Sequence, residues 1–544
     1  MPIDRAPKNS SFLKVFSDSW HGWSFGPPLG GSSRHVPWSS FIFIAMLEDI
    51  RLLGSAKTHQ PVDKKMRNHQ NSTKAFFIIM KHKTLILGLL LVTFIGQLAF
   101  ADKPDKPNIL FIAVDDLNDW AGYRGHSEVI TPNMDRLAKK GTWFSRAYCQ
   151  YPVCGASRAS VMTGLYFHQL ESKKLQVKDD YVKEKVESMG SAMLHDYLKK
   201  HGGYKTIAVG KILHCHLPLE GLDESGGRGS WNHNKDKNGK DIESNWKSKK
   251  TLTDWAPYNG KESKMSDSKA AAWAVKRLEE KHEKPFMLMV GFLRPHTPWH
   301  VPQKYFDMYD EAKITTPPYR EDDLEDVSKE AKKIINDGYP RTEWAKENNQ
   351  WRKAIHGYYA SITFADEKVG EVLDALEASP YRDNTIVVLW SDHGYHLGEK
   401  NTFQKHTLWE RSASTPMIIS LPKSMGGEKL TGRTDRIVGL IDIYPTLVDL
   451  CGLPANEKVE GRSLKPLLMD RQAEWDFPAL TYRKGDSKSV RDDRFRYIEY
   501  GDGSTELYDH LSDPNEWTNL AKDPGYAEQM KIMQEKLSHY HVAN

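Results

Sequence analysis

The sequence predicts an α/β protein in which helices flank a doubly wound, mostly parallel β-sheet. Continuous apolar runs of strand length alternate with longer stretches of helical pattern, as is typical of buried parallel strands joined by crossover helices. Several of these runs end in charged or imidazole side chains, as expected where parallel strands open onto a site. The predicted strands cover residues 108–114, 206–209, 286–292, 385–390 and 417–421, and predicted helices at 268–281 and 358–377 lie among them.

The first predicted strand is the clearest element of the chain. Residues 108–114 read Asn-Ile-Leu-Phe-Ile-Ala-Val, and two carboxylates, Asp115 and Asp116, follow at once. A helix is expected next, because Pro132 suits the first helical position and Gly141 suits a helix end.

The middle of the chain contains two segments with a different composition. Residues 221–264 are rich in Gly, Lys, Asn, Ser and Trp and predict long loops, which form either a lid over a substrate or surface excursions. Residues 311–349 are highly charged and predict a solvated helical insertion.

The character of the sequence changes again after Pro454. Residues 496–500 and 505–508 are separated by a Gly-Asp-Gly turn and predict a β-hairpin, and a helix is expected at 526–539. These features predict two parts, a catalytic domain at residues 102–454 and a smaller C-terminal α+β subdomain with an antiparallel sheet at residues 455–544.

The N-terminal region predicts export. A short basic stretch at residues 81–83 precedes an apolar run at 84–96 and the small-x-small sequence Ala99-Phe100-Ala101. This order is that of a signal peptide at residues 80–101 with cleavage near Ala101. The mature chain is therefore expected in the periplasm or outside the cell, or in a lysosomal compartment if the source is eukaryotic.

A signal peptide belongs at the start of translation, whereas this one begins at Met80. We therefore expect residues 1–79 to be a disordered, wrongly assigned upstream extension. The alternative is an internal membrane anchor. Because the apolar run is short for a membrane span, we expect no stable anchor.

Charge and cysteine content exclude two further classes of protein. Residues 1–101 hold 12 Lys and Arg against 5 Asp and Glu, which leaves 64 basic and 67 acidic residues elsewhere, so no basic domain indicates a nucleic-acid partner. Four cysteines (Cys149, Cys154, Cys215 and Cys451) are too few for a disulfide framework. The sequence His214-Cys215-His216 lacks a second ligand pair at zinc spacing and is a weak zinc signal.

Carboxylates after two predicted strands indicate a cation site. Asp115 and Asp116 repel each other unless positive charge neutralises them, and Asp392 and His393 follow the strand at 385–390. Strands of one parallel sheet bring these four side chains to the same edge. Ligands dominated by oxygen favour Ca²⁺, with Mg²⁺ as the alternative, over zinc.

Cationic and nucleophilic side chains recur near these carboxylates. Cys154 and Arg158 are four residues apart, one helical turn on the same face. Other basic side chains follow predicted strands or the Asp392 element; they are Lys211, His214, His296 and Lys405. Each of these has a bland alternative as a surface lysine or a structural histidine, but their joint occurrence beside a predicted cation site favours a catalytic centre.

These motifs, in this order, match one family. The chain resembles the type I, formylglycine-dependent sulfatases of the alkaline-phosphatase-like superfamily, and most closely their iduronate-2-sulfatase-like branch. The resemblance covers residues 107–519 and rests on six segments, which are 108–116, Cys154-Gly155-Ala156-Ser157-Arg158, Gly210-Lys211 with His214, Pro295-His296, Ser391-Asp392-His393-Gly394 with Leu397-Gly398-Glu399, and Glu506-Leu507-Tyr508-Asp509 with Asp513-Pro514.

The resemblance implies a mechanism for hydrolysing sulfate esters. Cys154 would be oxidised by a formylglycine-generating enzyme, and the aldehyde would hydrate to a geminal diol. One hydroxyl would attack sulfur and release the alcohol. The second hydroxyl would then lose its proton, so that sulfate leaves and the aldehyde returns, a collapse that a thiol cannot perform.

The resemblance also assigns roles to individual residues. The cation would be held by Asp115, Asp116, Asp392, His393 and the modified Cys154. Arg158 and Lys211 would orient the diol, and His214 would be the base for its collapse. His296 and Lys405 would bind sulfate oxygens and assist the leaving group.

The implied substrate is a sulfated carbohydrate. Arg294 and Tyr395 either contact the sugar or its carboxylate, or pack in the interior. The motif departs from its commonest form at Ala156, where the family usually has proline, so the efficiency of maturation is open.

Other functions remain as alternatives. One is a phosphate or phosphonate monoester hydrolase of the same superfamily, and another is an inactive polyanion-binding homologue. A serine hydrolase is disfavoured because the chain has no Gly-x-Ser-x-Gly elbow.

Overall fold

A computed structural model describes residues 106–541 except 173, 176, 230–243, 247–250 and 336–337. The predicted signal peptide and the segment before it lie outside the described residues. Within the described part, no helix is both long enough and apolar enough to cross a membrane.

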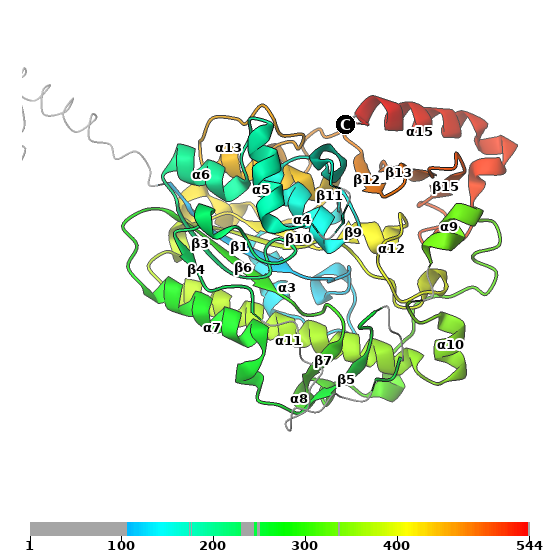
Figure 1. Ribbon diagram of the computed structural model, residues 1–544, viewed down its shortest axis with the longest axis horizontal. Helices are drawn as coiled ribbons and strands as arrows, with labels where there is room; N and C mark the ends of the chain where they lie inside the picture. The colour runs from blue at the N-terminus through cyan, green and yellow to red at the C-terminus, as the bar shows by residue number, and fades with distance from the viewer. Residues whose placement is uncertain are drawn as a thin grey trace, which may run out of the picture. The chain divides into compact units, whose positions relative to one another are not determined.

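A nine-stranded mixed sheet forms the centre of the described chain (Figure 1). Its strand order is β11-β2-β10-β8-β1-β6-β3-β4, and β9 pairs with β2. The four strands β8, β1, β6 and β3 are parallel, whereas β10 runs antiparallel to both β8 and β2. The strands are β1 (Asn108–Val114), β2 (Thr142–Tyr148), β3 (Lys205–Gly210), β4 (Glu224–Ser225), β6 (Phe286–Phe292), β8 (Thr385–Ser391), β9 (Ser414–Thr415), β10 (Met417–Ser420) and β11 (Gly432–Gly439).

The central strands are apolar throughout because both faces of the sheet are covered. Along β1, Ile109 and Phe111 pack into one hydrophobic core, while Leu110 and Ile112 pack into the other. Successive side chains of a strand point to opposite faces, so a strand buried on both sides reads as a continuous apolar run. The prediction of a doubly wound, mostly parallel sheet is confirmed.

Helices cover the two faces of the sheet (Figure 1). The helices on one face include α4 (Cys154–Thr163), α5 (Asp179–Ser188), α6 (Leu194–Gly202) and α13 (Ile443–Leu450). Those on the other face are α3 (Pro132–Lys140), α7 (Ser266–Glu279) and the long α11 (Trp351–Ala378). The helices predicted after Thr131 and at 268–281 and 358–377 are therefore present, and α11 begins earlier than predicted.

A four-stranded antiparallel sheet lies in the C-terminal part of the chain. The predicted hairpin is formed by β14 and β15, and the predicted final helix is α15. This small sheet joins the large one where the Tyr482 N–H donates to the Gln150 carbonyl at 2.9 Å. The elements are β12 (Ala479–Arg483), β13 (Ser487–Arg491), β14 (Phe495–Glu499), β15 (Thr505–Asp509) and α15 (Ala527–Tyr540).

The two segments predicted as loops and as an insertion are partly ordered by packing. The described residues of 221–264 include β5 (Trp255–Tyr258), which pairs in parallel with β7 (Trp299–Pro302). The charged insertion contains α9 (Lys329–Ile334) and α10 (Thr342–Glu347). It is less solvated than predicted, because Ala331 and Ile334 pack with Leu408 and Trp409 in one apolar cluster. The remaining short helices are α8 (Gln303–Phe306), α12 (Glu410–Ala413) and α14 (Lys465–Met469).

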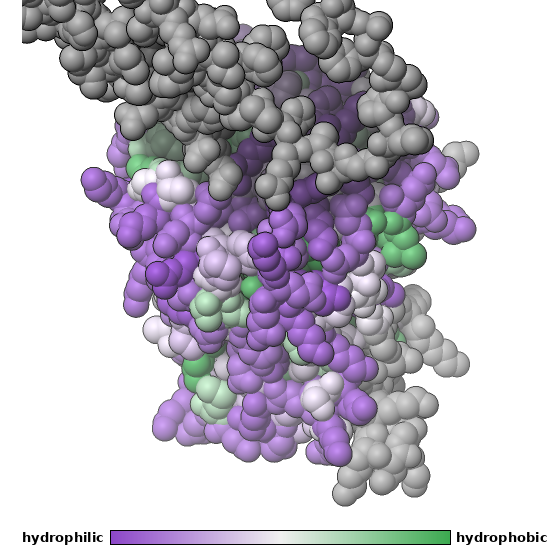
Figure 2. All heavy atoms as spheres, turned by 90° about the vertical axis from the view of Figure 1, so that its left-hand side faces the viewer, coloured by the Kyte–Doolittle hydropathy of each residue, from purple (hydrophilic) through white to green (hydrophobic). Residues whose placement is uncertain are grey.

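The visible part of the face in Figure 2 is mainly hydrophilic, and the hydrophobic side chains on it are scattered. Single exposed hydrophobic residues of this kind are normal on a folded protein and need no partner.

Candidate active site

The carboxyl ends of two neighbouring strands bring the acidic side chains together. Asp115 and Asp116 follow β1, Asp392 and His393 follow β8, and the two strands pair in parallel register up to Val114 and Ser391. Asp116 has a φ of 59°, in the left-handed region, and its N–H donates to Asp392 Oδ1 at 3.1 Å. This turn directs both carboxylates toward one point.

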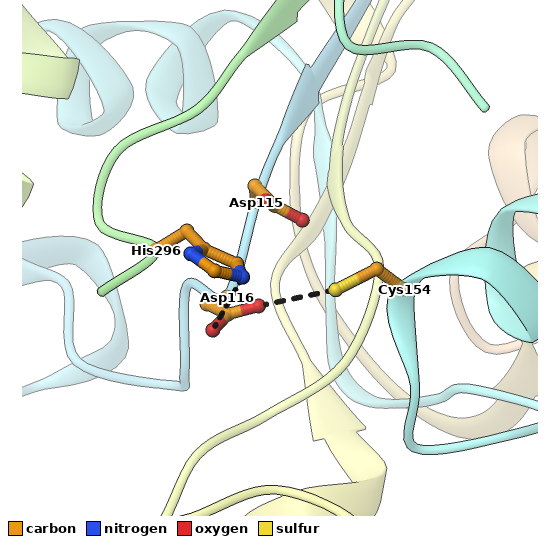
Figure 3. A group of neighbouring side chains, drawn as sticks. All are labelled: Asp115, Asp116, Cys154 and His296. Atoms are coloured by element: carbon orange, nitrogen blue, oxygen red, sulfur yellow. Dashed lines mark hydrogen bonds and ion pairs between the residues drawn. The ribbon is translucent and has the colours of Figure 1, made fainter. Parts of the chain in front are cut away.

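Cys154 faces these carboxylates from the first residue of α4 (Figure 3). The preceding Val153 is extended, so the helix begins at Cys154 and the thiol lies at its N-terminal end. Cys154 Sγ lies 3.5 Å from Asp116 Oδ1 and 3.3 Å from His393 Nε2. The thiol is 4 % exposed, so the reacting position lies at the bottom of the site.

Arg158 and Lys211 contact the carboxylates from the side of Asp115. Arg158 lies one turn after Cys154 and is completely buried, and its Nε donates to Asp392 Oδ2 at 2.7 Å. Arg158 Nη2 lies 3.2 Å from Asp115 Oδ1, and Lys211 Nζ lies 2.5 Å from Asp115 Oδ2. In this structure both cations contact carboxylates.

Lys405 connects the acidic cluster to the thiol. Its Nζ lies 2.6 Å from Asp116 Oδ1 and 3.0 Å from Cys154 Sγ. Burial alone would lower the pKa of Lys405, but the negative charges of Asp116 and Asp115 outweigh burial and raise this pKa well above its ordinary value. Lys405 is therefore a charged ammonium group at the reacting position.

His296 reaches the site from the loop after β6. It lies between Pro295 and Pro298, and its Nε2 is 3.9 Å from Asp116 Oδ2 (Figure 3). Burial lowers the pKa of His296 to about 3, although Asp116 acts in the opposite direction. The ring is therefore uncharged near neutral pH and offers one donor and one acceptor.

His214 lies within electrostatic range of Lys211 and Asp115. It is half-buried, and burial together with the charge of Lys211 lowers its pKa to about 4. The structure thus brings together Asp115, Asp116, Cys154, Arg158, Lys211, His296, Asp392, His393 and Lys405 in one cluster. His214 interacts electrostatically with Lys211 and Asp115 of this cluster.

Asp115 and Asp116 are ionised. Burial would raise the pKa of Asp115, but Lys211 and Arg158 lower it well below its ordinary value. Burial acts on Asp116 in the same way, and the positive charge of Lys405 opposes it, so that the pKa of Asp116 is also lowered. Ionised carboxylates are the form that a divalent cation requires.

The donor set fits a divalent cation. Two overlapping groups have ligand atoms within 4.8 Å of one another, namely Asp115, Asp116, Cys154 and His296, and Asp116, Cys154, Asp392 and His393. Among the described residues, the buried Asp116 Oδ2 has no hydrogen-bond donor. An ionised, buried oxygen without a donor is costly unless a cation approaches it.

The comparisons with known proteins identify the family. A family model named Sulfatase matches residues 107–453, and a model of the C-terminal region of N-sulphoglucosamine sulphohydrolase matches residues 398–543. This chain belongs to the sulfatase family. Like other members of the family, it is a hydrolase of sulfate esters.

Two relatives illustrate the range of similarity. The sulfatase is 40% identical over 435 residues to a protein of Formosa agariphila named Sulfatase, an alignment that covers 77% of this chain and 84% of the relative. It is 28% identical over 417 residues to iduronate 2-sulfatase of Homo sapiens, covering 68% of this chain and 73% of the relative. The predicted sulfatase family is confirmed, and iduronate 2-sulfatase is among its relatives.

Solved structures share the fold. One, solved in complex with its substrate D-glucosamine-2-N,6-O-disulfate, has a TM-score of 0.62 at 22% identity and covers 80% of the sulfatase and 98% of its own chain. Phosphonate monoester hydrolase of Agrobacterium radiobacter has a TM-score of 0.64 at 21% identity, covering 80% and 95%. At these identities the likeness concerns the architecture alone.

Sequence reasoning missed two residues that shape the site of the sulfatase. Ser157 Oγ donates to the Asp392 carbonyl at 2.6 Å, and the Tyr358 hydroxyl donates to the Asp116 carbonyl at 2.8 Å. Both fix the backbone that carries the carboxylates. Ser157 lies inside the Cys154 motif, so that motif was a signal for it, whereas Tyr358 lies in α11 and no local pattern marks it.

The structure also decides three open points. Arg294 and Tyr395 are each 1 % exposed, and the Tyr395 hydroxyl donates to the Phe403 carbonyl at 2.9 Å, so both residues pack in the interior. All four cysteines are free. Both ring nitrogens of His216 are engaged, by the Gly210 carbonyl and by Ser225 Oγ, which removes the weak zinc signal.

Proposed function

We propose that this sulfatase removes sulfate from a sulfated carbohydrate by means of an aldehyde residue made from Cys154 and a bound divalent cation. The observation that carries the proposal is the position of Cys154 Sγ, within 3.5 Å of Asp116, His393 and Lys405. The buried sulfur atom of Cys154 thus faces the carboxylates that would bind a metal ion. It also faces Lys405, whose positive charge would attract an anionic ester.

The chemistry of the thiol supports its conversion. Burial raises the pKa of Cys154, and Asp115 raises it further, so the thiol stays protonated and is a poor nucleophile. Oxidation to formylglycine by a maturation enzyme would replace the thiol of Cys154 with an aldehyde, which would hydrate to a diol. One hydroxyl of the diol would attack the sulfur atom of the sulfate ester, and the second would expel the sulfate.

The residues around Cys154 would bind the metal ion and stabilise the charges of the site. Asp115, Asp116, Asp392 and His393 would bind Ca²⁺ or Mg²⁺, which lowers the cost of forming an alkoxide and neutralises sulfate oxygens. Arg158 and Lys211 keep Asp115 ionised and in place through their contacts of 3.2 and 2.5 Å.

The remaining cationic and imidazole groups would act on the substrate. Lys405 presents an ammonium group beside the reacting position, where it would bind a sulfate oxygen. His296 donates its Nδ1–H to the Thr297 carbonyl, so its Nε2 would have to take up a proton before it could assist the leaving oxygen. His214 would accept the proton when the covalent sulfate is released.

Carbohydrate as the substrate class is supported by the relatives. Iduronate 2-sulfatase is named for a sulfated sugar, and one structural neighbour was solved with a disulfated glucosamine as its substrate. We also propose export after cleavage near Ala101, on the strength of the sequence at residues 80–101, with a catalytic part up to residue 454 and a C-terminal subdomain after it.

Mass spectrometry of one tryptic peptide tests the modification. Trypsin releases residues 147–158, which contain both Cys149 and Cys154. After reduction and alkylation, we expect one alkylated cysteine at Cys149 and an aldehyde mass at residue 154, so Cys149 serves as an internal control. Two alkylated cysteines in fully active protein would contradict the proposal.

A substrate panel tests the reaction. We expect release of sulfate from 4-nitrophenyl sulfate and from at least one of 2-sulfated iduronate, 6-sulfated glucosamine and 6-sulfated galactose. A higher kcat/KM for 4-nitrophenyl phosphate or a phosphonate monoester would favour the phosphatase alternative. No turnover by protein with a confirmed aldehyde would favour an inactive homologue.

A further inference from the structure

The residue after Lys405 has a backbone conformation that side chains rarely adopt. His406 has a φ of 82°, in the left-handed region. Its N–H donates to the Pro152 carbonyl at 3.1 Å, and its own carbonyl accepts from Arg483 Nε at 3.0 Å. The conformation is therefore held from both sides, by the segment before Cys154 and by the end of β12, and such strain is concentrated at functional sites.

The side chain of His406 meets a tyrosine from the charged insertion. The Tyr339 hydroxyl lies 3.3 Å from His406 Nε2, and both residues are partly exposed. Burial raises the pKa of Tyr339, and the charges of Lys405 and Asp116 act on the same hydroxyl. The Tyr339 hydroxyl therefore lies within electrostatic reach of the reacting position.

The segment that carries Tyr339 is fixed to the loop after β8. Gln404 Nε2 donates to the Ile334 carbonyl at 3.1 Å, and Thr342 Oγ1 donates to the Gly398 carbonyl at 2.6 Å. On the side away from this loop, Trp246 Nε1 donates to the Gly338 carbonyl at 3.1 Å. These bonds flank Tyr339 in sequence, so its hydroxyl is positioned by the fold.

The pair carries no charge near neutral pH. Burial and the charge of Lys405 lower the pKa of His406 to about 3, and the pKa of Tyr339 is raised. Lys405 would already bind the sulfate group, which is the anionic part of the ester. A neutral imidazole and a phenol beside it together offer both donors and acceptors, which is what a hydroxyl group of the alcohol half needs.

On the basis of the proposed function, we propose that Tyr339 and His406 form a specificity-determining pair that hydrogen-bonds a sugar hydroxyl adjacent to the sulfated carbon. The pair would select among sulfated sugars by the position and orientation of that hydroxyl. A site built to bond a hydroxyl discriminates against an alcohol that lacks one.

Two variants test the pair without disturbing the backbone that holds it. Tyr339→Phe removes only the hydroxyl, and His406→Gly removes the ring at a φ that glycine adopts freely. Tyr181→Phe is the matched control, since its hydroxyl donates to the Leu170 carbonyl away from the described cluster. Each variant is first checked for its melting temperature and for the fraction of aldehyde at residue 154.

The measurement is a ratio of two kcat/KM values. The numerator is that for the best sulfated sugar of the panel above, and the denominator is that for 4-nitrophenyl sulfate, which has no hydroxyl group. We expect this ratio to fall about tenfold in Tyr339→Phe and in His406→Gly, mainly through KM for the sugar, and to stay constant in Tyr181→Phe. The double variant should lose little more than either single variant, because the two groups act as a pair.

The outcomes separate this proposal from the proposed function. An unchanged ratio in both single variants, while wild type cleaves the sugar sulfate, would overturn the pair and leave the proposed function intact. Wild type that cleaves 4-nitrophenyl sulfate but no sugar of the panel would overturn carbohydrate as the substrate, and the pair with it.

Discussion

At the scale of single residues, spacing predicted which side chains share a face but not which atoms they contact. The four-residue separation of Cys154 and Arg158 places both on the inner side of α4, as predicted. Arg158 nevertheless binds Asp115 and Asp392, because these carboxylates arrive from strands distant in sequence. Partners of this kind depend on the packing of the sheet, which local sequence does not encode.

Replacing Cys154 tests the reacting position. We expect Cys154→Ala to lower kcat for 4-nitrophenyl sulfate by at least about a thousandfold, since it removes the nucleophile precursor while the rest of the site remains. Cys215→Ser, at an exposed thiol, should retain turnover. Comparable kcat values for Cys154→Ala and wild type would show that another group performs the attack.

Cation binding can be measured without turnover. Ca²⁺ at a hundred times its Kd should stabilise wild type by about 2.7 kcal/mol, seen as a rise in melting temperature that EDTA reverses. In Asp392→Asn this rise should be absent, and in Asp383→Asn, at an exposed carboxylate, it should persist. An equal rise in all three proteins would place the ion elsewhere.

At the scale of elements, the sequence revealed strands that are buried on both faces and missed those at the margins. The predicted strands at 108–114, 286–292 and 385–390 are apolar runs at the centre of the sheet, where both cores cover them. β2 and β11 escaped prediction because each carries Arg and polar residues on a half-exposed face. Their strand character comes from pairing, because β11 pairs with β2 and β2 also pairs with β10.

A buried carboxyl in β15 gives the stability a pH dependence. Burial raises the pKa of Glu506 to about 7, although the hydrogen bond from Trp409 Nε1 at 2.9 Å and the charge of Lys400 oppose this. Between its ordinary pKa and about 7, the folded protein holds a proton that the unfolded chain has lost. The free energy of unfolding therefore falls as pH rises through this range.

Glu506→Gln should remove this dependence. The amide stays neutral, so above pH 7 the variant should be more stable than wild type by up to about 2 to 3 kcal/mol, and below pH 4.5 the difference should vanish. Urea unfolding at pH 4.5, 6 and 8 measures it. A difference that is independent of pH would mean that Glu506 does not titrate in the folded protein.

At the scale of the whole molecule, the large and small sheets are held together by a common core and by buried charge. Leu480 and Leu507 of the small sheet pack in the same apolar cluster as Phe144 of the large one. Arg496 is completely buried, with its guanidinium 2.5 Å from Glu410 and 2.7 Å from Glu516. The sequence predicted the hairpin that carries Arg496 but not these partners.

Substitutions of two neighbouring arginines test how much the contacts of Arg496 contribute to the free energy of unfolding. Arg496→Met should lower the free energy of unfolding by about 3 to 5 kcal/mol, because it removes the buried cation nearest to the buried Glu516 and the partly buried Glu410. Arg494→Met removes a pair between the half-exposed Arg494 and the buried Asp509 and should cost less than Arg496→Met, because Arg494 itself is partly solvated. Equal losses for the two variants would show that the buried network does not join the sheets.

The charges of the active site have a consequence for the attraction of substrate. Three buried carboxylates, Asp115, Asp116 and Asp392, are matched by three buried cations, Arg158, Lys211 and Lys405, and His214 and His296 are uncharged. Side chains alone therefore leave the site close to electrical neutrality. A bound divalent ion would then give the site a net positive charge, because the aspartates are already neutralised by side chains. Electrostatic attraction of an anionic ester would therefore depend on whether that ion is bound.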